Sequence, residues 1–577
     1  MRGIPLGVAV VAFGLYFIGL GTPPFIDPLE GFHAEVARQM AIGHDWVTAR
    51  VNGVRYFDKP PVLYWLISAS FAALGPTPFA ARLWPALAAV GVAAVTARLG
   101  VMLGGARVGL LAGLIVVSNL GMFLHGRIVK PDLVFILWIV LAYAGFAIAY
   151  RGGGRRGLVL FYASLGLAAL TKDILGALGP LTVVALFFWL TRERPVGPWV
   201  PWWGVLLTAA IALPWYLAVE AGSRGFLWYT IVDNHLLNFT RQRMFPDEDV
   251  PLGSIEFLVV TVLAFLPWAL ALPWALARAF RRPWADATAR LWPLFGLWAV
   301  VVIGFFAISP FKLPHYGFPA FPALALLVAR AWDETIEARP GSASPRALLA
   351  PLLVLFVLVA ATLAAVWSGI VRIPAGALAS FDVTTRNLAA RGHAVPQSPV
   401  DAWLPLVLRG AVIFAIASGA LAVAVWRRSA AFGIGVALAA TLAFLPAVAG
   451  EGMTQFIRAR AVRPLAQALV QHAGPGDLIV HEGPVENSAS ALIVLRRPVA
   501  VVNGLQSNLA FGATFPEARD VFWDSPRLQT AWAAPGRHWL LSTVQPERSV
   551  VRSLPAGRVH LIAQSGGRWL YSNMMER

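Results

Sequence analysis

The sequence predicts a polytopic α-helical membrane protein that ends in a small α/β domain. Of its 577 residues, 58% are hydrophobic and only 13% are charged, whereas a soluble globular protein is nearer half apolar and a quarter charged. Apolar runs long enough to cross a bilayer recur over residues 1–450. Residues 451–577 lose this pattern and alternate short β-type runs with helical ones.

Apolar stretches of about 17–25 residues predict about thirteen transmembrane helices. The first stretch has a basic start and an apolar core but no clear small-residue cleavage site, so we expect an uncleaved first helix. The expected spans lie near residues 4–20, 79–102, 108–125, 132–149, 157–172, 174–190, 201–219, 256–277, 289–308, 315–331, 347–371, 405–425 and 431–449.

Arginine clusters in alternate loops predict the orientation of these spans. Positive residues gather in cytoplasmic loops, and all the clusters fall on that side if the N-terminus is cytoplasmic. An odd number of spans then places the C-terminal segment outside a bacterial inner membrane. The clusters are Arg98 and Arg107; Arg151, Arg155 and Arg156; Arg192 and Arg194; Arg278, Arg281 and Arg282; and Arg427 and Arg428.

The net charge is +17, but its distribution along the chain is not typical of a nucleic-acid-binding protein. The cations sit in short clusters between apolar runs, as anionic lipid headgroups favour, rather than on one soluble face. The chain has no cysteine, which excludes disulfides, thiolate chemistry and cysteine-ligated metals. We therefore expect membrane lipids as partners and no nucleic acid.

Three polar segments are expected outside: residues 21–78, 220–255 and the tail from 451 onward. The first contains a plausible amphipathic helix, "EGFHAEVARQMAIG", and a second short helix after a double proline. In the tail, "PGDLIVHEG", "ALIVLRRPVAVVNG" and "RHWLLSTV" are β-type runs, while "RPLAQALVQHAG" and "PEARDVFW" are helical in pattern. This alternation predicts an α/β domain over residues 451–577, after a transmembrane domain over residues 1–450.

The stretch "VRYFDKPP" concentrates charge where a membrane protein should avoid it. Arg55 and Lys59 are four residues apart and could bind a phosphate, with Asp58 available for a cation. Tyr56 and its aromatic neighbours suit the headgroup level. The alternative is an interfacial anchor of snorkelling cations and aromatic rings, which needs no catalysis.

A second cluster follows the first span directly, in "FIDPLEGFHAEVARQM". In a helix that begins near Pro28, Glu30 and His33 are one turn apart on one face. Asp27 precedes that helix. The alternative interpretation is a helix opening in which acidic residues complement the helix dipole.

Further polar residues lie at predicted outer helix ends and predict a shared cavity at the outer membrane surface. Such a cationic cavity suits an anionic substrate with phosphates, with a carboxylate as base. The chain has no nucleotide-binding motif, so no nucleotide cofactor is expected and the donor must be activated in the membrane already. A lipid-phosphate-linked sugar fits. The residues are His125, Arg127, Lys130, Asp132, Lys172, Asp173, Asp233, His235, Arg241, Arg243, Lys312, His315 and Tyr316.

Several motifs in consistent order over residues 1–335 resemble the GT-C membrane glycosyltransferases. The similarity is to bacterial aminoarabinose transferases acting on lipid A and their protein O-mannosyltransferase relatives. "HAEVARQM" and "VRYFDKPPVLYWL" resemble that family's first outer loop, and "LTKDILGALGPL" resembles its T-K-G segment. "DNHLLNFTRQR" with the later "LPWAL", and "FKLPHYGFPAFPALALL", are similar to two further family segments.

This resemblance implies a polyprenyl-phosphate sugar donor and a lipid or protein acceptor. It implies that Lys59, Arg55 and Tyr56 hold the donor phosphate with help from Lys312 and Tyr316. The polar clusters above predict that His33, Lys130, Asp132, Lys172 and His315 contribute to substrate binding. The resemblance implies that Asp58 and His235 coordinate a divalent metal. Mixed carboxylate and imidazole ligands suit zinc.

Two departures from the family pattern concern the base and the acceptor. Leu29 stands where the family usually has the aspartate presumed to be the base, which leaves Glu30 or the displaced Asp27. An acceptor that is already acidic, such as a phosphate, would need no base. Lys130 stands where relatives often have an acid, with Asp132 nearby.

The sequence therefore predicts an inverting glycosyltransferase whose site faces the outer side of the inner membrane. In this prediction, Asp27 or Glu30 orients the acceptor, and Lys59 and Arg55 stabilise the leaving lipid phosphate. A lipid acceptor similar to lipid A is preferred, and a protein hydroxyl is the alternative. A secondary transporter or lipid flippase is the alternative from another class, although the chain lacks the paired halves typical of one.

Overall fold

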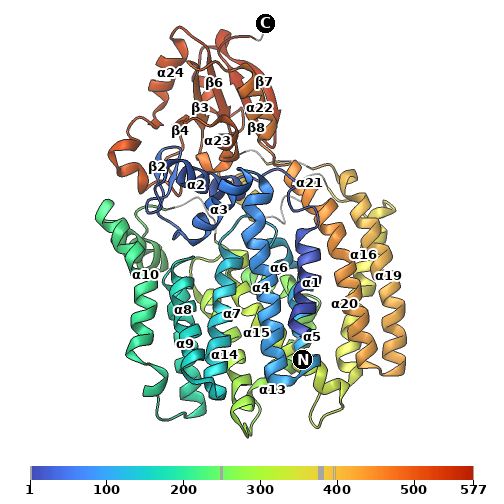
Figure 1. Ribbon diagram of the computed structural model, residues 1–577. Coiled ribbons are helices and arrows are strands. Elements are labelled where there is room, and N and C mark those ends of the chain that lie inside the picture. The colour runs from blue at the N-terminus through green and yellow to red at the C-terminus, as the bar shows by residue number, and fades with distance from the viewer. Residues whose placement is uncertain (1–2, 247–250, 375–382, 394, 397, 576–577) are drawn as a thin grey trace.

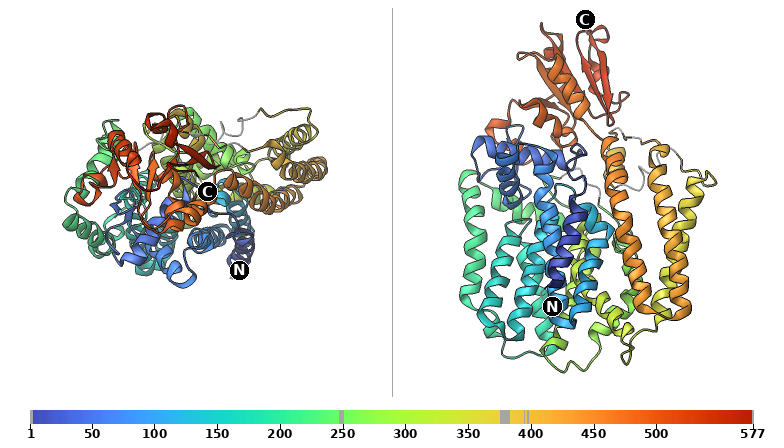
Figure 2. Two further views of the ribbon diagram at one scale, coloured as in Figure 1. Left: turned by 90° about the horizontal axis from the view of Figure 1, so that it is seen from above. Right: turned by 45° about the vertical axis from the view of Figure 1, so that its right-hand side comes forward.

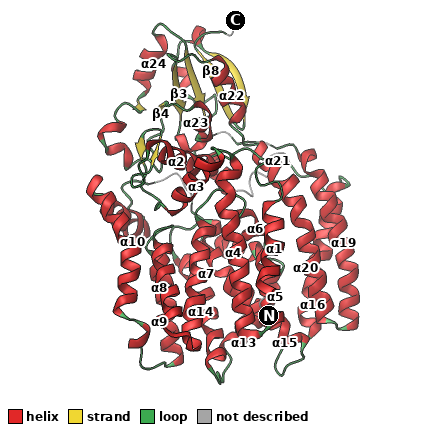
Figure 3. Ribbon diagram, in the orientation of Figure 1, coloured by secondary structure: helices red, strands yellow, loops and turns green. Residues whose placement is uncertain are grey.

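A helical bundle with a sheet domain on one end forms the molecule (Figure 1). The computed structural model describes residues 3–246, 251–374, 383–393, 395–396 and 398–575. Among these described residues, strands are confined to the C-terminal domain and a two-stranded hairpin in the first outer loop (Figure 3). The predicted fold class, a polytopic helical protein with a small C-terminal α/β domain, is confirmed.

Every predicted apolar segment is helical over most of its length, because each is too apolar to leave its backbone unpaired in lipid. α16, α19 and α20 pack together at one side of the bundle (Figures 1 and 2). The bundle helices are α1 Gly3–Phe17, α4 Pro78–Gly104, α5 Ala106–Ser118, α6 Leu120–His125, α7 Asp132–Ile148, α8 Gly154–Ala169, α9 Leu175–Thr191, α10 Trp202–Gly222, α12 Ser254–Ala264, α13 Leu272–Phe280, α14 Ala287–Ile308, α15 Phe321–Ile336, α16 Pro345–Trp367, α19 Leu404–Arg427 and α20 Ala430–Ala447.

The number of full spans is smaller than the sequence predicts. By length and composition, seven helices within the described residues can cross a membrane, or up to eight if a bent pair is one span. The difference arises partly because α1, α5 and α9 have only 15, 13 and 17 residues. It arises also because Asp132–Ala169 counts as one span, although α7 and α8 are two helices that pack against each other across a turn at Arg151 and Gly152.

One predicted span, residues 256–277, is not a straight helix. It breaks between α12 and the helical segment Trp268–Phe280, and the two parts are bent by 102°. Pro267 lies at the break and Pro273 lies in the first turn of α13. Proline removes a backbone donor and cannot continue a helix, which accounts for the correction.

The first outer loop has the two helices that the sequence predicts. α2 covers Glu30–Gly43, the whole of the predicted amphipathic helix. The hairpin β1 Arg50–Val51 and β2 Val54–Arg55 follows, with Asn52 and Gly53 at positive φ in its turn. α3, Val62–Leu74, begins directly after the double proline. The second outer segment contains the π-helix η3, Tyr229–Leu237.

The C-terminal domain is a six-stranded mixed sheet in the order β5-β4-β3-β6-β8-β7. β3 pairs in parallel with β4 and β6, and β4 in parallel with β5, whereas β8 pairs antiparallel with β6 and β7. The strands are β3 Leu478–Glu482, β4 Ala500–Val502, β5 Phe522–Trp523, β6 His538–Ser542, β7 His560–Ser565 and β8 Arg568–Ser572; the helices are α22 Arg463–His472, α23 Ser490–Leu495 and α24 Ser525–Ala533.

Two segments of this domain differ from the sequence prediction. The predicted helix "PEARDVFW" is a single 3₁₀ turn, Pro516–Ala518, followed by β5. The first part of the predicted strand "ALIVLRRPVAVVNG" lies in helix α23, and only its second part forms β4. Short apolar runs fit both a buried strand and a buried helix, and packing decides between them.

A buried ion pair fixes the first outer loop to the bundle. Arg82 of α4 donates from Nε and Nη2 to the Glu30 carboxylate at 2.8 and 2.6 Å. Its other N–H groups donate to the carbonyl oxygens of Leu20, Pro23 and Pro24. Glu30 also accepts from two backbone N–H groups, so the pair is fully hydrogen-bonded although both side chains are buried.

The first outer loop is bound on its other side to the C-terminal domain. Asp27 accepts from the backbone N–H of Ser490 at 3.0 Å and from its hydroxyl. Asn52 exchanges two hydrogen bonds of 2.8 Å with the backbone of Val499. The loop is therefore an ordered layer between the bundle and the sheet domain.

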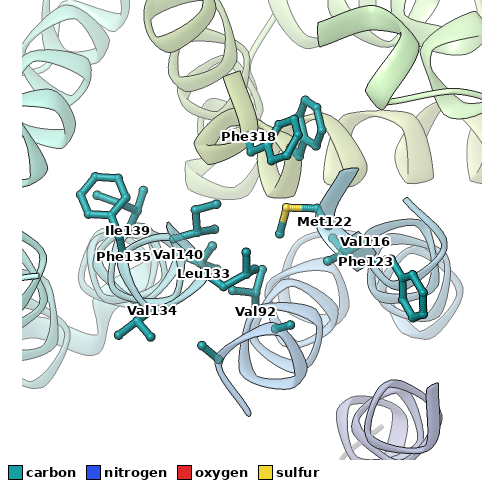
Figure 4. Packing of buried hydrophobic residues seen from close by; sticks show 14 of the residues in the cluster. Val92, Val116, Met122, Phe123, Leu133, Val134, Phe135, Ile139, Val140 and Phe318 are labelled. Atoms are coloured by element: carbon teal, nitrogen blue, oxygen red, sulfur yellow. The ribbon is translucent and has the colours of Figure 1, made fainter. Parts of the chain in front are cut away.

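Beneath this layer lies a tightly packed apolar core. Buried side chains of α4, α6 and α7, among them Val92, Met122 and Leu133, meet Phe318 of the 3₁₀ segment Pro314–Ala320 (Figure 4). Close packing of this kind makes a rigid base, because cores this dense resist displacement of their side chains.

We expect Arg82→Met to destabilise the folded protein strongly. Removing one partner of a buried ion pair costs about 3–5 kcal/mol because the remaining charge stays buried and unpaired. Thermal unfolding in detergent, followed by tryptophan fluorescence, measures the loss. The matched control is Arg527→Gln, since Arg527 pairs with the 93% exposed Asp520, and an exposed pair contributes about 0–1 kcal/mol. If Arg82→Met loses no more thermal stability than Arg527→Gln, the structural role assigned to the Arg82–Glu30 pair is wrong.

Candidate active site

Two adjoining cavities lie where the first outer loop meets the bundle and the C-terminal domain. The first, the polar cavity, has a volume of about 220 Å³. The second, the aromatic cavity, has a volume of about 300 Å³. The polar cavity is lined by His33, Tyr56, Asp58, Lys59, Lys130, Asp132, Lys172, His315 and Tyr316, among others. The aromatic cavity is lined by Phe57, Trp215, Phe226, Phe239, Phe305 and Phe306, with His235 and Arg243.

Five residues line both cavities and mark the boundary between them: Asp58, Lys59, Lys172, Phe311 and Tyr316. Two of the five are lysines. A cationic boundary with polar side chains on one side and aromatic rings on the other is suited to an amphiphile whose anionic group joins a polar and an apolar part.

Lys172 is held at this boundary by Asp132. Its ammonium lies 2.7 Å from Asp132 Oδ1 and 5.0 Å from the centre of the Tyr316 ring. His315 Nε2 approaches the same carboxylate oxygen at 3.6 Å. Asp132 opens α7, and Lys172 follows the end of α8, which are the helix ends where an acid and a cation are favourable.

His33 of α2 and Tyr56, which follows β2, line one wall of the polar cavity. His33 Nδ1 lies 2.9 Å from the Tyr64 hydroxyl, and the Tyr56 ring meets Phe32 edge-on with centroids 4.9 Å apart. Burial, together with the charges of Lys130 and Lys59, lowers the pKa of His33 from 6.5 to about 3. The imidazole is therefore neutral at physiological pH.

Asp58 and His235, the predicted metal ligands, both line the aromatic cavity. Asp58 accepts the Tyr229 hydroxyl, and His235 Nδ1 lies 2.6 Å from the Thr230 carbonyl oxygen, which leaves Nε2 for a metal. Among the residues that the structure describes, no group of three or more His, Cys, Asp or Glu side chains could hold an ion. Catalytic zinc sites use three protein ligands, so an ion here would need others from the substrate.

Asp27 and Glu30, the two carboxylates predicted to be catalytic, do not line either cavity. Glu30 is bound to Arg82, and Asp27 to Ser490. Burial raises the pKa of Asp27 to about 6, against the opposing effects of Arg568 and the Ser490 hydrogen bonds. Both side chains hold the outer loop in position, and the role of either as the base stays a prediction that this arrangement does not favour. The residue between them, Leu29, lines the polar cavity.

Arg55 and Lys312, predicted to bind the donor phosphate, also lie outside the two cavities. Arg55 Nε lies 2.5 Å from Glu517 of the C-terminal domain, and its Nη1 donates to the Ser223 hydroxyl and the Gly222 carbonyl. Lys312 donates to Ser254 Oγ and to the carbonyl oxygens of Ala307 and Ser309. Both cations are engaged by the protein itself, and their role at the donor phosphate stays a prediction.

Six polar residues that the sequence interpretation did not identify also line the polar cavity. We call them the roof: Asn387, Arg391, Glu486, Asn487, Ser507 and Asn508. Four of them lie in loops after β3 and β4. Ligands bind beyond the carboxyl ends of parallel strands, so "HEGPVENS" and "VVNGLQSN" carried a signal that could have identified them.

All four lysines of the chain belong to this region. The chain has 46 lysine and arginine residues, and its lysines are Lys59, Lys130, Lys172 and Lys312. The first three line the polar cavity, and Lys312 lines a neighbouring cavity with Arg241 and Arg243. Arginine supplies every other permanent side-chain cation.

Comparison with known proteins finds relatives that are similar to part of this sequence. A family model described as dolichyl-phosphate-mannose-protein mannosyltransferase matches residues 33–230. The undecaprenyl phosphate-α-4-amino-4-deoxy-L-arabinose arabinosyl transferase of Pseudomonas aeruginosa is 31% identical over 346 residues, which are 56% of this chain and 58% of that protein. Its namesake in Aeromonas salmonicida is 30% identical over 54% of this chain and 57% of that protein. The chain thus spans less than two thirds of the length of these relatives.

The similarity of the folds extends over the whole chain. The crystal structure of ArnT from Cupriavidus metallidurans bound to undecaprenyl phosphate matches with a TM-score of 0.78 at 23% identity, covering 99% of this chain and 98% of that one. The fold is that of ArnT. The similarity to aminoarabinose and O-mannosyl transferases that the motifs indicate is confirmed over part of the chain, and the chain is a multi-pass membrane protein.

We expect His33→Gln to make the folded state less sensitive to acid. The pKa of His33 is about 3 in the folded protein against 6.5 when unfolded, so between these values the unfolded chain binds the extra proton. Stability therefore rises with pH across this window and is lost as the pH falls. The melting temperature in detergent should fall less for His33→Gln than for wild type from about pH 7 to about pH 5. The exposed-histidine variant His44→Gln is the control, and a fall in His33→Gln equal to wild type would contradict the prediction.

Proposed function

We propose that this protein is a glycosyltransferase that moves a sugar from a polyprenyl-phosphate donor to a lipid acceptor at the outer face of the bacterial inner membrane. The observation that carries the proposal is the pair of adjoining cavities that share Lys59 and Lys172. The names and folds of the similar proteins support it, since they are transferases of undecaprenyl-phosphate-linked sugars.

The donor spans the boundary between the cavities in this proposal. Its isoprenoid chain lies against Phe57, Trp215 and Phe305 of the aromatic cavity, where apolar contact favours it. Its phosphate lies between Lys59 and Lys172, with Tyr316 beside them. Its sugar then enters the polar cavity, under the roof.

The reaction is a single displacement at the anomeric carbon. An acceptor oxygen forms the new bond to that carbon while the bond to the donor phosphate oxygen breaks, and polyprenyl phosphate leaves with the electron pair. Lys59 and Lys172 stabilise the charge that builds on the leaving phosphate. Because attack and departure occur on opposite faces, the anomeric configuration is inverted.

The acceptor that suits this site is an oxygen that is already ionised, such as a phosphate. The carboxylates predicted as bases are bound elsewhere, and Asp132 in the cavity is paired with Lys172. A cationic cavity attracts an anionic acceptor and needs to remove no proton from it. A lipid A-like phosphate fits this description better than a serine or threonine hydroxyl, which requires a base.

The proposed orientation follows from the ends of the helices. Arg155 begins α8 and Lys172 follows its last residue, so the arginine-rich loops and the cavities lie at opposite ends of this helix. Positive residues favour the cytoplasmic side. The cavities and the C-terminal domain then face outward, where the donor and acceptor lipids meet.

Lipid mass spectrometry of cells with and without the protein tests the function. Loss of the protein should leave a polyprenyl-phosphate sugar to accumulate and remove an equal sugar mass from one lipid. Donor accumulation with no lipid change would indicate a protein acceptor. No change in either, with the protein expressed in the reference cells, would contradict the transferase.

We expect Lys59→Ala to lower transfer by about 100-fold or more, as loss of one group that stabilises developing charge does. One test is complementation of the deletion strain, followed by the same lipid mass spectrometry. The second is the initial rate of sugar transfer in membranes. Arg155→Ala is the matched control because it removes an exposed cation at the other end of α8. Full activity of Lys59→Ala at wild-type protein levels would refute the phosphate role.

A divalent metal remains a prediction of the family resemblance, and no step above depends on one. Held by Asp58 and His235, a metal would add positive charge beside the donor phosphate. We expect EDTA to reduce transfer by wild type and Zn²⁺ to restore it, while His235→Ala stays low in both conditions. Wild-type activity that is unchanged after chelation would show that this prediction is wrong.

A further inference from the structure

We propose that the C-terminal domain binds the sugar of the donor and that Asn487 is the residue that holds it. The inference rests on the proposed function and assigns recognition of the sugar to a part of the protein outside the helical bundle. Two independent observations carry it. One is the edge that the sheet presents to the polar cavity, and the other is a buried amide at that edge.

The sheet turns its usual ligand-binding edge toward the polar cavity. β3 lies between β4 and β6 and is parallel to both. The chain runs from β3 outward through β4 to β5 and then returns to β6 on the other side of β3, so the strand order reverses between β3 and β6. Open parallel sheets bind ligands beyond the carboxyl ends of their strands at such a switch point. Pro484, Glu486 and Asn487, which follow β3, line the polar cavity.

The other flank of this switch point also reaches the polar cavity. Val544, two residues after β6, pairs with His393 in an isolated antiparallel bridge. Asn387, in helix α18 Val383–Ala390, and Arg391 lead up to that bridge and line the polar cavity. Residues that adjoin the carboxyl ends of both β3 and β6 therefore meet at this cavity.

Asn487 brings an unpaired hydrogen-bond donor to this edge. The residue is only 4% exposed, and its Nδ2 has no hydrogen-bond partner among the described residues. A buried donor that makes no hydrogen bond destabilises the folded protein, so native structures keep few of them. Because Asn487 lines the polar cavity, a hydroxyl or ring oxygen of a bound sugar would supply the missing acceptor.

The loop that carries Asn487 is fixed in position. The backbone N–H of Asn487 donates to the Pro484 carbonyl at 3.0 Å, and its carbonyl oxygen accepts from Arg568 Nε at 3.1 Å. Glu486 accepts the backbone N–H of Asn508 at 2.8 Å, which joins the loops after β3 and β4. An amide held in this way binds its partner without first losing conformational freedom.

The side chains of the C-terminal domain suit a sugar rather than a phosphate. Within residues 398–575, no lysine or arginine lines the polar cavity. Amides and hydroxyls both donate and accept hydrogen bonds, and a carboxylate accepts them, which matches the hydroxyl and amino groups of a sugar. The lysines that suit the phosphate come from the bundle and the first outer loop. The residues that the C-terminal domain contributes are Pro484, Glu486, Asn487, Ser507 and Asn508.

Competition binding to the purified full chain in nanodiscs tests the inference without an acceptor. The competitor is the polyprenyl-phosphate sugar that accumulates in cells lacking the protein, and labelled undecaprenyl phosphate is the sugar-free ligand that it displaces. We expect Asn487→Leu, which keeps the size of the side chain and removes the amide, to weaken competition about tenfold. The affinity for undecaprenyl phosphate itself should stay at the wild-type value.

Two controls separate sugar binding from a structural role. Gln471→Leu removes an exposed amide from α22 of the same domain and should leave both affinities unchanged. Because Asn487 Nδ2 has no partner among the described residues, Asn487→Leu should not lower the melting temperature, whereas loss of a structural hydrogen bond would. If Asn487→Leu does not fold, Asn487→Ala takes its place.

Unchanged competition by the sugar donor in these Asn487 variants would overturn the proposal. An equal loss of both affinities would show a structural role and would also overturn it. If donor competition is unchanged but sugar transfer in membranes falls, the roof binds the acceptor, and the proposal is wrong. If undecaprenyl phosphate does not bind wild type, or no polyprenyl-phosphate sugar accumulates, the proposed function itself fails.

Discussion

The buried pair of Glu30 and Arg82 is the constraint on which the site depends. Arginine has five N–H donors, and in Arg82 all five are bound, two to Glu30 and three to backbone carbonyls of the preceding loop. Burying two charges is favourable only when both are completely hydrogen-bonded, and here that requirement determines the course of the chain before α2. Leu29 and His33, on either side of Glu30, are thereby held at the polar cavity.

The same loop then determines where the C-terminal domain sits. Asp27, Asn52 and Arg55 each bond to that domain, through Ser490, Val499 and Glu517. These contacts place the carboxyl ends of β3 and β4 over the polar cavity. The roof residues that follow these strands are thereby brought to it. The loop thus contributes one wall directly and positions the opposite side of the cavity indirectly, which explains why so many of its charged residues are not themselves in the site.

Local patterns in the sequence were sufficient for the helices, for the α/β character of the tail and for most of the polar cavity. α2 and its neighbours follow from amphipathic spacing and from proline, and His33, Lys59 and Asp132 follow from charge at helix ends. Pairing between distant residues was beyond such patterns: Arg55 and Glu517 are 462 positions apart, and Asp27 and Ser490 are 463 apart. A charged residue looks the same in sequence whether it meets a ligand or a partner that the fold brings to it.

Arginine and lysine are used differently at several positions of this chain. Arg82 and Arg55 use the planar arginine fork to satisfy several acceptors at fixed positions, a structural role that requires its geometry. Lysine presents a compact ammonium on a flexible stem, which can follow a phosphate as its charge changes during transfer. Most ion pairs of the described residues use arginine, while Lys172 pairs with Asp132 and Lys312 donates to neighbouring protein oxygens. The case for Lys59 and Lys172 at the phosphate therefore rests on their position at the boundary of the two cavities. Arg55 shows the limit of such reasoning, because arginine also suits phosphate and only the fold shows that Arg55 meets Glu517.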